Sequence, residues 1–101
     1  MIAVLVRFHY DKQFNEARVR KIAENARAKF EGMPGLRSKV FTVDPHIRDA
    51  FNFYVWDSES AAKAFFTDDF FERVTELYGV RPTVQYAQIT AVVDNYSTQP
   101  H

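Results

Sequence analysis

Residues 51–62 read FNFYVWDSESAA and contain the two kinds of element from which the fold is built. The first six residues are mostly aromatic or β-branched, a composition that favours a β-strand. Asp57 or Ser58 then offers a side-chain oxygen that can cap the N-terminus of a helix. The buried side of this helix is expected to include Ala61, Ala62, Phe65 and Phe66. The stretch therefore predicts a strand that leads directly into a helix.

The chain before this stretch predicts a strand, a helix and a second strand. Residues 2–9 are apolar and β-branched before their first charge, as in a buried strand. From Phe14 to Met33, apolar residues recur at helical spacing, and Gly32 followed by Pro34 ends this helix. Residues 36–43 alternate in polarity, which is typical of a strand.

The chain after this stretch continues the helical region and closes with a strand. The sequence Thr67-Asp68-Asp69 resembles a second capped helix start, so we expect a break or kink there. Gly79 ends the helix, and residues 83–93 form a long β-branched strand. The order β-α-β-β-α-β predicts an α+β, ferredoxin-like fold in which helices cover one face of a four-stranded antiparallel sheet. We assign residues 1–95 to a single domain and residues 96–101 to a flexible tail.

Both faces of the predicted sheet are apolar, whereas a monomer should expose a polar face. We place one residue set on the face that the helices leave bare: Ala3, Leu5, Arg7, His9, Asn52, Tyr54, Trp56, Tyr86, Gln88, Thr90 and Val92. This set is aromatic and amphipathic, so a second copy of the chain is its simplest cover. We therefore expect a homodimer whose sheets pack face to face as an α/β barrel.

Composition excludes several classes of function. The 101 residues include no cysteine, so there is no disulfide, thiol nucleophile or thiolate metal site. Thirteen basic and thirteen acidic residues cancel, which argues against nucleic-acid binding. The longest apolar run, residues 1–6, is too short to cross a membrane, so we expect a cytoplasmic protein. A metal site would need His9, His46 and the terminal His101 to converge, and we expect none.

His9 and a group of aromatic and amide side chains are the candidate site residues. His9 ends the first strand and is the best candidate for a general base, because imidazole titrates close to neutral pH. Tyr54, Trp56 and Tyr86 can wall a pocket for a flat organic molecule, with Asn52 and Gln88 as hydrogen-bond donors.

Each candidate also has a purely structural interpretation. His9 can simply cap its strand, and the rings can fill a dimer interface. A second pocket can lie between helices and sheet, where small alanines meet Phe65 and Phe70. Arg7, Arg37 or Lys39 can neutralise an enolate or carboxylate if its side chain points inward.

The residues also resemble a known family. The segment MPGLRSKVFT at residues 33–42, the aromatic strand at residues 51–56 with the helix start at residues 57–65, and Tyr78-Gly79-Val80 are similar to YdhR-like monooxygenases. These belong to the dimeric α/β-barrel superfamily of antibiotic-biosynthesis monooxygenases. Residues 58–78 lack the histidine of the haem-degrading branch. The loop at residues 44–49 replaces a hairpin that is usually glycine-rich.

The resemblance implies a monooxygenase that needs no flavin, metal or haem. Such an enzyme oxidises a small, electron-rich aromatic or polyketide-like substrate with O2, after a base has removed a substrate proton. Two alternatives stay open: a cyclase or isomerase that uses the same proton abstraction, and a non-catalytic dimer that binds a small hydrophobic ligand.

Overall fold

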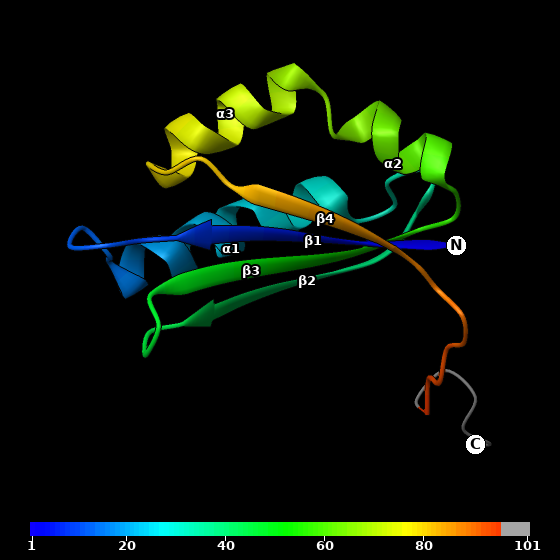
Figure 1. Ribbon diagram of the computed structural model, residues 1–101, viewed down its shortest axis with the longest axis horizontal. Coiled ribbons are helices and arrows are strands. Elements are labelled where there is room, and N and C mark those ends of the chain that lie inside the picture. The colour runs from blue at the N-terminus through cyan, green and yellow to red at the C-terminus, as the bar shows by residue number, and fades with distance from the viewer. Residues whose placement is uncertain (96–101) are drawn as a thin grey trace.

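A computed structural model describes residues 1–95. The elements in chain order are β1 (Ile2–His9), α1 (Glu16–Phe30), β2 (Leu36–Asp44), β3 (Asp49–Trp56), α2 (Glu59–Phe65), α3 (Asp68–Tyr78) and β4 (Thr83–Gln88). The four strands form one antiparallel sheet in the order β2-β3-β1-β4. The three helices lie on one side of this sheet (Figure 1). The α+β, ferredoxin-like fold expected from the sequence is confirmed.

Local chemistry explains where the helices begin and end. Ser58 caps α2 by accepting a hydrogen bond from the backbone N–H of Ala61. The expected break follows, because Thr67 caps α3 in the same way through the N–H of Phe70. Gly79 ends α3 in the left-handed conformation, at φ 85°.

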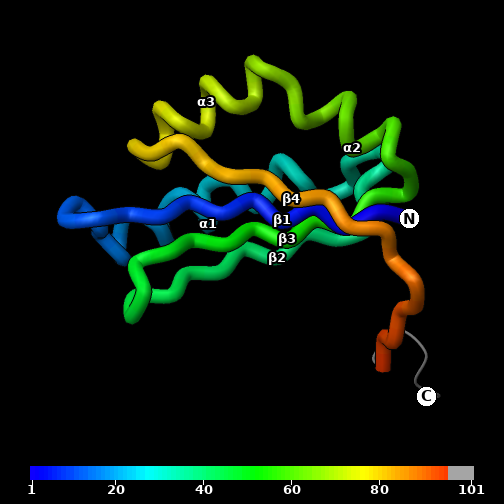
Figure 2. Tube along the Cα trace, in the orientation of Figure 1, coloured from blue at the N-terminus to red at the C-terminus, as the bar shows by residue number. Residues whose placement is uncertain are grey.

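The last strand is shorter than predicted. β4 ends at Gln88, whereas the sequence predicted a strand over residues 83–93. The reason is the length of its partner: Gln88 already lies opposite Ile2, where β1 begins. Beyond this point the chain leaves the sheet, as the trace in Figure 2 shows. The predicted tail at residues 96–101 lies outside the described residues.

The core lies between sheet and helices and is built largely from aromatic rings. Trp56, Tyr54 and Phe8 are the largest fully buried side chains. The ring of Tyr54 stacks on Trp56 and meets Phe66 edge to face, with ring centroids 6.1 and 4.9 Å apart. These contacts fix the side chains of β3 against the end of α2, and so determine the shape of the space between the sheet and the helices.

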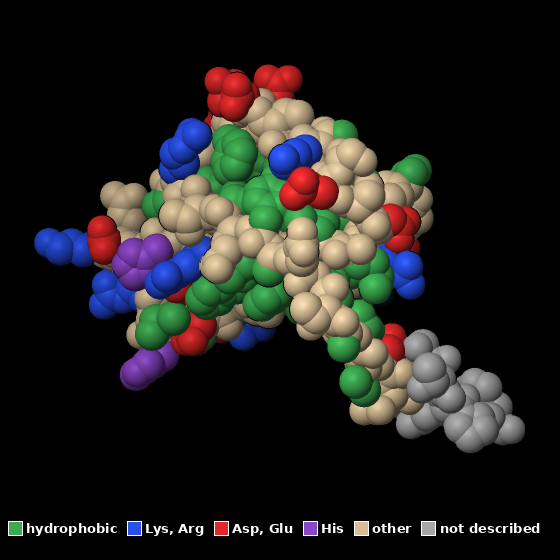
Figure 3. All heavy atoms as spheres, turned by 45° about the vertical axis from the view of Figure 1, so that its right-hand side comes forward, with side chains coloured by type: hydrophobic (Ala, Val, Ile, Leu, Met, Phe, Trp, Pro, Cys, Tyr) green, Lys and Arg blue, Asp and Glu red, His purple; other side chains and the backbone are tan. Residues whose placement is uncertain are grey.

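The other face of the sheet carries apolar side chains without cover from a helix. Leu5 lies opposite Phe53, which in turn lies opposite Val40 of β2. The exposed fractions of Phe53 and Val40 are 48% and 53%. Figure 3 shows hydrophobic side chains at the surface among charged ones. No helix within residues 1–95 is long and apolar enough to cross a membrane.

Candidate functional site

The strand register separates the predicted site residues into two groups. Val4 lies opposite Tyr54 and Val6 opposite Asn52, and both valines are buried beneath the helices. His9 points the other way, because successive side chains of a strand alternate between faces. The prediction that His9 shares a face with the amide and aromatic residues is therefore wrong.

The same register places all five predicted substrate-binding residues on the face of the sheet where the helices lie, although Tyr86 and Gln88 are exposed there. On β4, Tyr86 lies opposite Val4 and Gln88 opposite Ile2, so both share the helix-covered face. The predicted set of bare-face residues was correct for β1 only. On β3 the bare face instead carries Phe51, Phe53 and Val55, whose β1 partners include Leu5.

A cavity of about 280 Å³ lies between the helices and the β2–β3 side of the sheet. Two of the predicted substrate-binding residues, Asn52 and Tyr54, line it. The other walls are mostly apolar and come from α1, β2, α2 and α3, including the predicted Phe65 and Phe70. Trp56 lies behind Tyr54, and neither Tyr86 nor Gln88 reaches this cavity.

Lys39 is the central polar residue of the cavity. It lies opposite Tyr54 in the β2–β3 register, and its Nζ donates a hydrogen bond of 2.8 Å to the Tyr54 hydroxyl. The same Nζ lies 3.4 Å from the ring centroid of Phe30 and 4.1 Å from that of Phe41. No carboxylate forms an ion pair with Lys39 within residues 1–95.

Burial changes the protonation of these groups. Loss of solvent, followed by the charge of Lys29, lowers the pKa of Lys39 to about 7. The surrounding ring faces favour the ammonium form and so oppose the lowering of the Lys39 pKa, but the amine is still shielded from solvent. Burial also raises the pKa of the Tyr54 hydroxyl, so this group stays a phenol at neutral pH. Lys29 and Arg73 line the same cavity, and no carboxylate of residues 1–95 does, so the cavity favours an anionic ligand.

A second polar group lies deeper in the cavity. The Asn52 side-chain amide donates a hydrogen bond of 3.2 Å to the Tyr78 hydroxyl. Burial raises the pKa of Tyr78, an effect that the bond from Asn52 partly offsets. The Tyr78 backbone carbonyl accepts a bond of 2.8 Å from the Tyr10 hydroxyl, which ties the end of α3 to the end of β1. Asn52 and Tyr78 can therefore hold a ligand oxygen in a fixed place.

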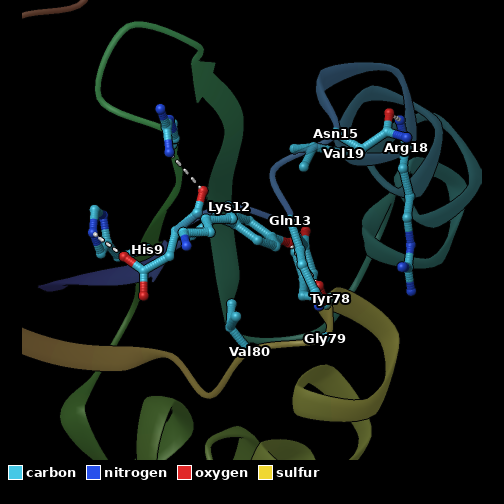
Figure 4. A pocket seen from close by; sticks show the side chains of 12 residues that line it. His9, Lys12, Gln13, Asn15, Arg18, Val19, Tyr78, Gly79 and Val80 are labelled. Atoms are coloured by element: carbon cyan, nitrogen blue, oxygen red, sulfur yellow. Dashed lines mark hydrogen bonds and ion pairs between the residues drawn. The ribbon is translucent and has the colours of Figure 1, made fainter.

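His9 belongs to a different cluster, around the fully buried carboxylate of Asp49. Its Nδ1 lies 2.6 Å from Asp49 Oδ1, and the Arg7 Nε donates to Oδ2 at 2.6 Å. A hollow of about 650 Å³ opens beside His9 and extends to Arg18 of α1 (Figure 4). The other ring nitrogen of His9, Nε2, lies 3.8 Å from Asp11 Oδ1, and both residues line this hollow.

The remaining histidines do not form a site with His9. His46 lies exposed in the turn between β2 and β3, where its backbone N–H bonds to Asp44. His101 is outside the part of the chain that the structure describes. Within residues 1–95 no group of three or more metal-ligating side chains comes together.

The sequence pointed to Lys39 only as one of three possible cations, and it missed Asp49. Alternation along β2 places Lys39 with Phe41 and Val43, a pattern that could have indicated an inward side chain. The sequence places Asp49 in a loop, whereas the structure has it as the first residue of β3, opposite His9.

Comparisons with known proteins define the fold further. No protein-family model matches the chain, and no curated protein does. A Streptomyces coelicolor monooxygenase from the gene ActVA-Orf6, solved with Nanaomycin D, is 19% identical, with a TM-score of 0.67 over 91% of this chain and 89% of that one. SnoaB, a cofactor-independent oxygenase from Streptomyces nogalater, is 19% identical, with a TM-score of 0.59 over 92% and 94%. Rv0793 from Mycobacterium tuberculosis is 12% identical, with a TM-score of 0.67 over 92% and 98%.

The chain has the fold of solved structures described as antibiotic-biosynthesis monooxygenases. The match covers most of each chain, so it includes the helices and the sheet that enclose the Lys39 cavity. At these identities the likeness establishes the antibiotic-biosynthesis monooxygenase fold but no activity. The narrower resemblance to YdhR-like proteins stays a prediction.

Proposed function

We propose that this protein is a cofactor-independent monooxygenase that acts with O2 on a small, electron-rich aromatic or polyketide-like substrate in the Lys39 cavity. The observation that carries the proposal is the Lys39 amine, held 2.8 Å from the Tyr54 hydroxyl in an aromatic cavity that no carboxylate of the described chain lines. Structural neighbours described as a monooxygenase and as a cofactor-independent oxygenase support the same kind of chemistry.

The Lys39 amine supplies the base. With a pKa of about 7, a large share of it is unprotonated at neutral pH and can accept a proton from a phenol or enol. Lys29 and Arg73 stabilise the resulting anion, and the Asn52–Tyr78 pair orients its oxygen. The apolar walls keep water from the anion.

The oxidation then needs only the substrate and O2. The anion passes one electron to O2, and the two radicals combine to form a carbon–oxygen bond. For a CH2 group beside a phenol, one oxygen atom replaces both hydrogens as a carbonyl, and the other oxygen leaves with those hydrogens as water. The substrate is oxidised and O2 is reduced, so the atoms and electrons balance.

Oxygen uptake tests the proposal. The purified protein is given dihydroxynaphthalenes, anthrones and simple phenols without an added cofactor. We expect uptake above the protein-free rate, a loss of at least about tenfold in Lys39→Met, and no change in Lys21→Met, which alters an exposed lysine of α1. If Lys39→Met stays active while His9→Ala is inactive, the base is His9, as the sequence predicted.

The mass of the product separates the alternatives. A gain of oxygen indicates an oxygenase, whereas an unchanged mass or a loss of water indicates a cyclase or isomerase that uses the same base. Tight binding without turnover indicates a protein that only binds a small hydrophobic ligand.

We also propose a homodimer that covers the bare face of the sheet. Phe53 and Val40 are half exposed there beside Leu5, and a chain of this length gains stability by burying such a surface. The cytoplasmic location and the single domain over residues 1–95 stay predictions.

A further inference from the structure

Lys39 lies at the boundary between the inner cavity and the surface. A groove of about 460 Å³ lies outside the cavity, beside the end of α1 and the start of β2. Phe30, Lys39 and Phe41 line both the groove and the cavity. A small molecule in either space can therefore meet the Lys39 amine.

The surroundings of this amine are those of a nucleophile rather than of an ion-paired lysine. Among the described residues its polar contact is one hydrogen bond, to the Tyr54 hydroxyl, and the rings of Phe30, Phe41 and Tyr54 lie close around it. Loss of solvent and nearby cations are the two conditions that make a lysine amine reactive towards carbonyl groups. Lys29 of α1 provides such a cation, and Arg73 of α3 lines the same cavity.

We propose that Lys39 captures aldehydes and ketones as an imine, which makes a carbonyl compound the ligand class of this cavity. The inference rests on the proposed function only in placing the ligand beside Lys39. Nζ attacks the carbonyl carbon, and the carbonyl oxygen becomes the hydroxyl of a carbinolamine. This hydroxyl leaves as water when the C=N bond forms, so the step needs no oxidant or reductant.

Two neighbouring groups assist this step. The Tyr54 hydroxyl lies 2.8 Å from Nζ, so it can donate a hydrogen bond to the departing hydroxyl, while the proton that completes the water comes from the carbinolamine nitrogen. Asn52 and Tyr78 lie further inside, where they can bind a second oxygen of the ligand. A dicarbonyl or hydroxy-carbonyl compound would use both positions.

Reductive trapping tests the inference on the native protein. Benzaldehyde and sodium cyanoborohydride are added at pH 7, and peptide mass mapping then measures benzyl addition at each amine. The sequence has five lysines, so Lys12, Lys21, Lys29 and Lys63 serve as internal controls. An exposed lysine with a pKa near 10.4 is unprotonated in only about one molecule in 10³ at pH 7. We expect Lys39 to be labelled at least about tenfold faster than any other lysine.

Variants then connect the label to the geometry. Lys39→Arg keeps the charge but cannot form the imine, so the selective label should disappear, while Lys21→Gln should leave it unchanged. Tyr54→Phe should slow labelling of Lys39 severalfold because it removes the hydrogen bond to the departing hydroxyl. Labelling of Lys39 at the rate of the other lysines in the native protein overturns the inference, whatever the variants do.

The outcome is separate from that of oxygen uptake. If uptake depends on Lys39 but trapping is not selective, the carbonyl inference fails and the oxygenase stands. If trapping is selective and the product mass shows no added oxygen, the inference stands and the oxygenase fails.

Discussion

Lys39 makes the stability of the folded chain depend on pH. Its pKa is about 7 in the folded state and about 10.4 in an unfolded chain, so between these values the unfolded chain binds the extra proton. Stability from this residue therefore rises with pH through that window, and below pH 7 it adds no slope. Urea unfolding at pH 7 and 9 should show native stability rising by about 2 kcal/mol relative to Lys39→Met. Parallel pH dependence of the two proteins would contradict this.

Asp49 should couple strongly to Arg7. Its carboxylate is fully buried and depends on Arg7 and His9 for its hydrogen bonds. Arg7→Leu leaves the charge with one partner and should cost about 2 to 3 kcal/mol of unfolding free energy. A double-mutant cycle with Asp49→Asn should then give a coupling energy above about 1 kcal/mol.

The exposed pair between Arg37 and Asp57 is the matched control for this cycle. Its atoms are 3.3 Å apart, and both side chains are more than half exposed. Arg37→Leu should therefore change the unfolding free energy by less than about 1 kcal/mol. Equal costs for the two arginine variants would show that burial of Asp49 does not set the strength of its ion pair.

Residue types were easier to predict than residue positions at the site. Asn52 and Tyr54 were predicted as ligand-binding residues and do line the cavity, because polar tips among rings are typical of a pocket. His9 was placed with them, yet it lies on the opposite face. The alternation of side chains divides each strand into two sets of residues, one for each face of the sheet. Only the register between strands, such as the pairing of Leu5 with Phe53, shows which sets lie on the same face.

Among the elements, the turn before β2 should be the most sensitive to an added methyl group. Gly35 has φ 81°, and a Cβ there would lie 3.0 Å from the Cβ of Ala61 in α2. Gly32 has φ 71° but nothing within 4 Å of such a Cβ. Gly32→Ala should cost about 1 kcal/mol for the backbone strain alone, and Gly35→Ala about 2 to 3 kcal/mol. Thermal or urea unfolding of both variants measures the difference.

The two costs separate backbone strain from packing. If they are equal, the contact between Gly35 and α2 adds nothing, and the position of α2 does not depend on this turn. The element boundaries that sequence predicted well, at Ser58, Thr67 and Gly79, are likewise set by local backbone chemistry. The end of β4 was missed because it depends on where β1 begins, far away in the sequence.

For the whole molecule, the bare face of the sheet decides the state of assembly. The sequence indicated two apolar faces, and the structure has them, although the bare one is made by Phe51, Phe53 and Val55 rather than by Tyr54 and Trp56. An error of one residue in the register exchanges the two faces of a strand, but both faces are still apolar, so this property could be predicted from the sequence. The same error changes which side chains lie on the bare face, so these could not be predicted.

The proposed dimer should therefore depend on Phe53. Phe53→Asp places a charge in the middle of the bare face, between Leu5 and Val40, and should convert the dimer to a monomer in sedimentation experiments. Leu77→Asp is the control for assembly alone, because Leu77 is also 48% exposed but lies on α3, away from the bare face, where it lines the Lys39 cavity. The control should remain dimeric. A native protein that sediments as a monomer would exclude the dimer. A Leu77→Asp variant that dissociates, while Phe53→Asp does not, would place the interface on the helix side. Because residues of a single chain already line the cavity around Lys39, a monomeric Phe53→Asp variant should still label Lys39 selectively.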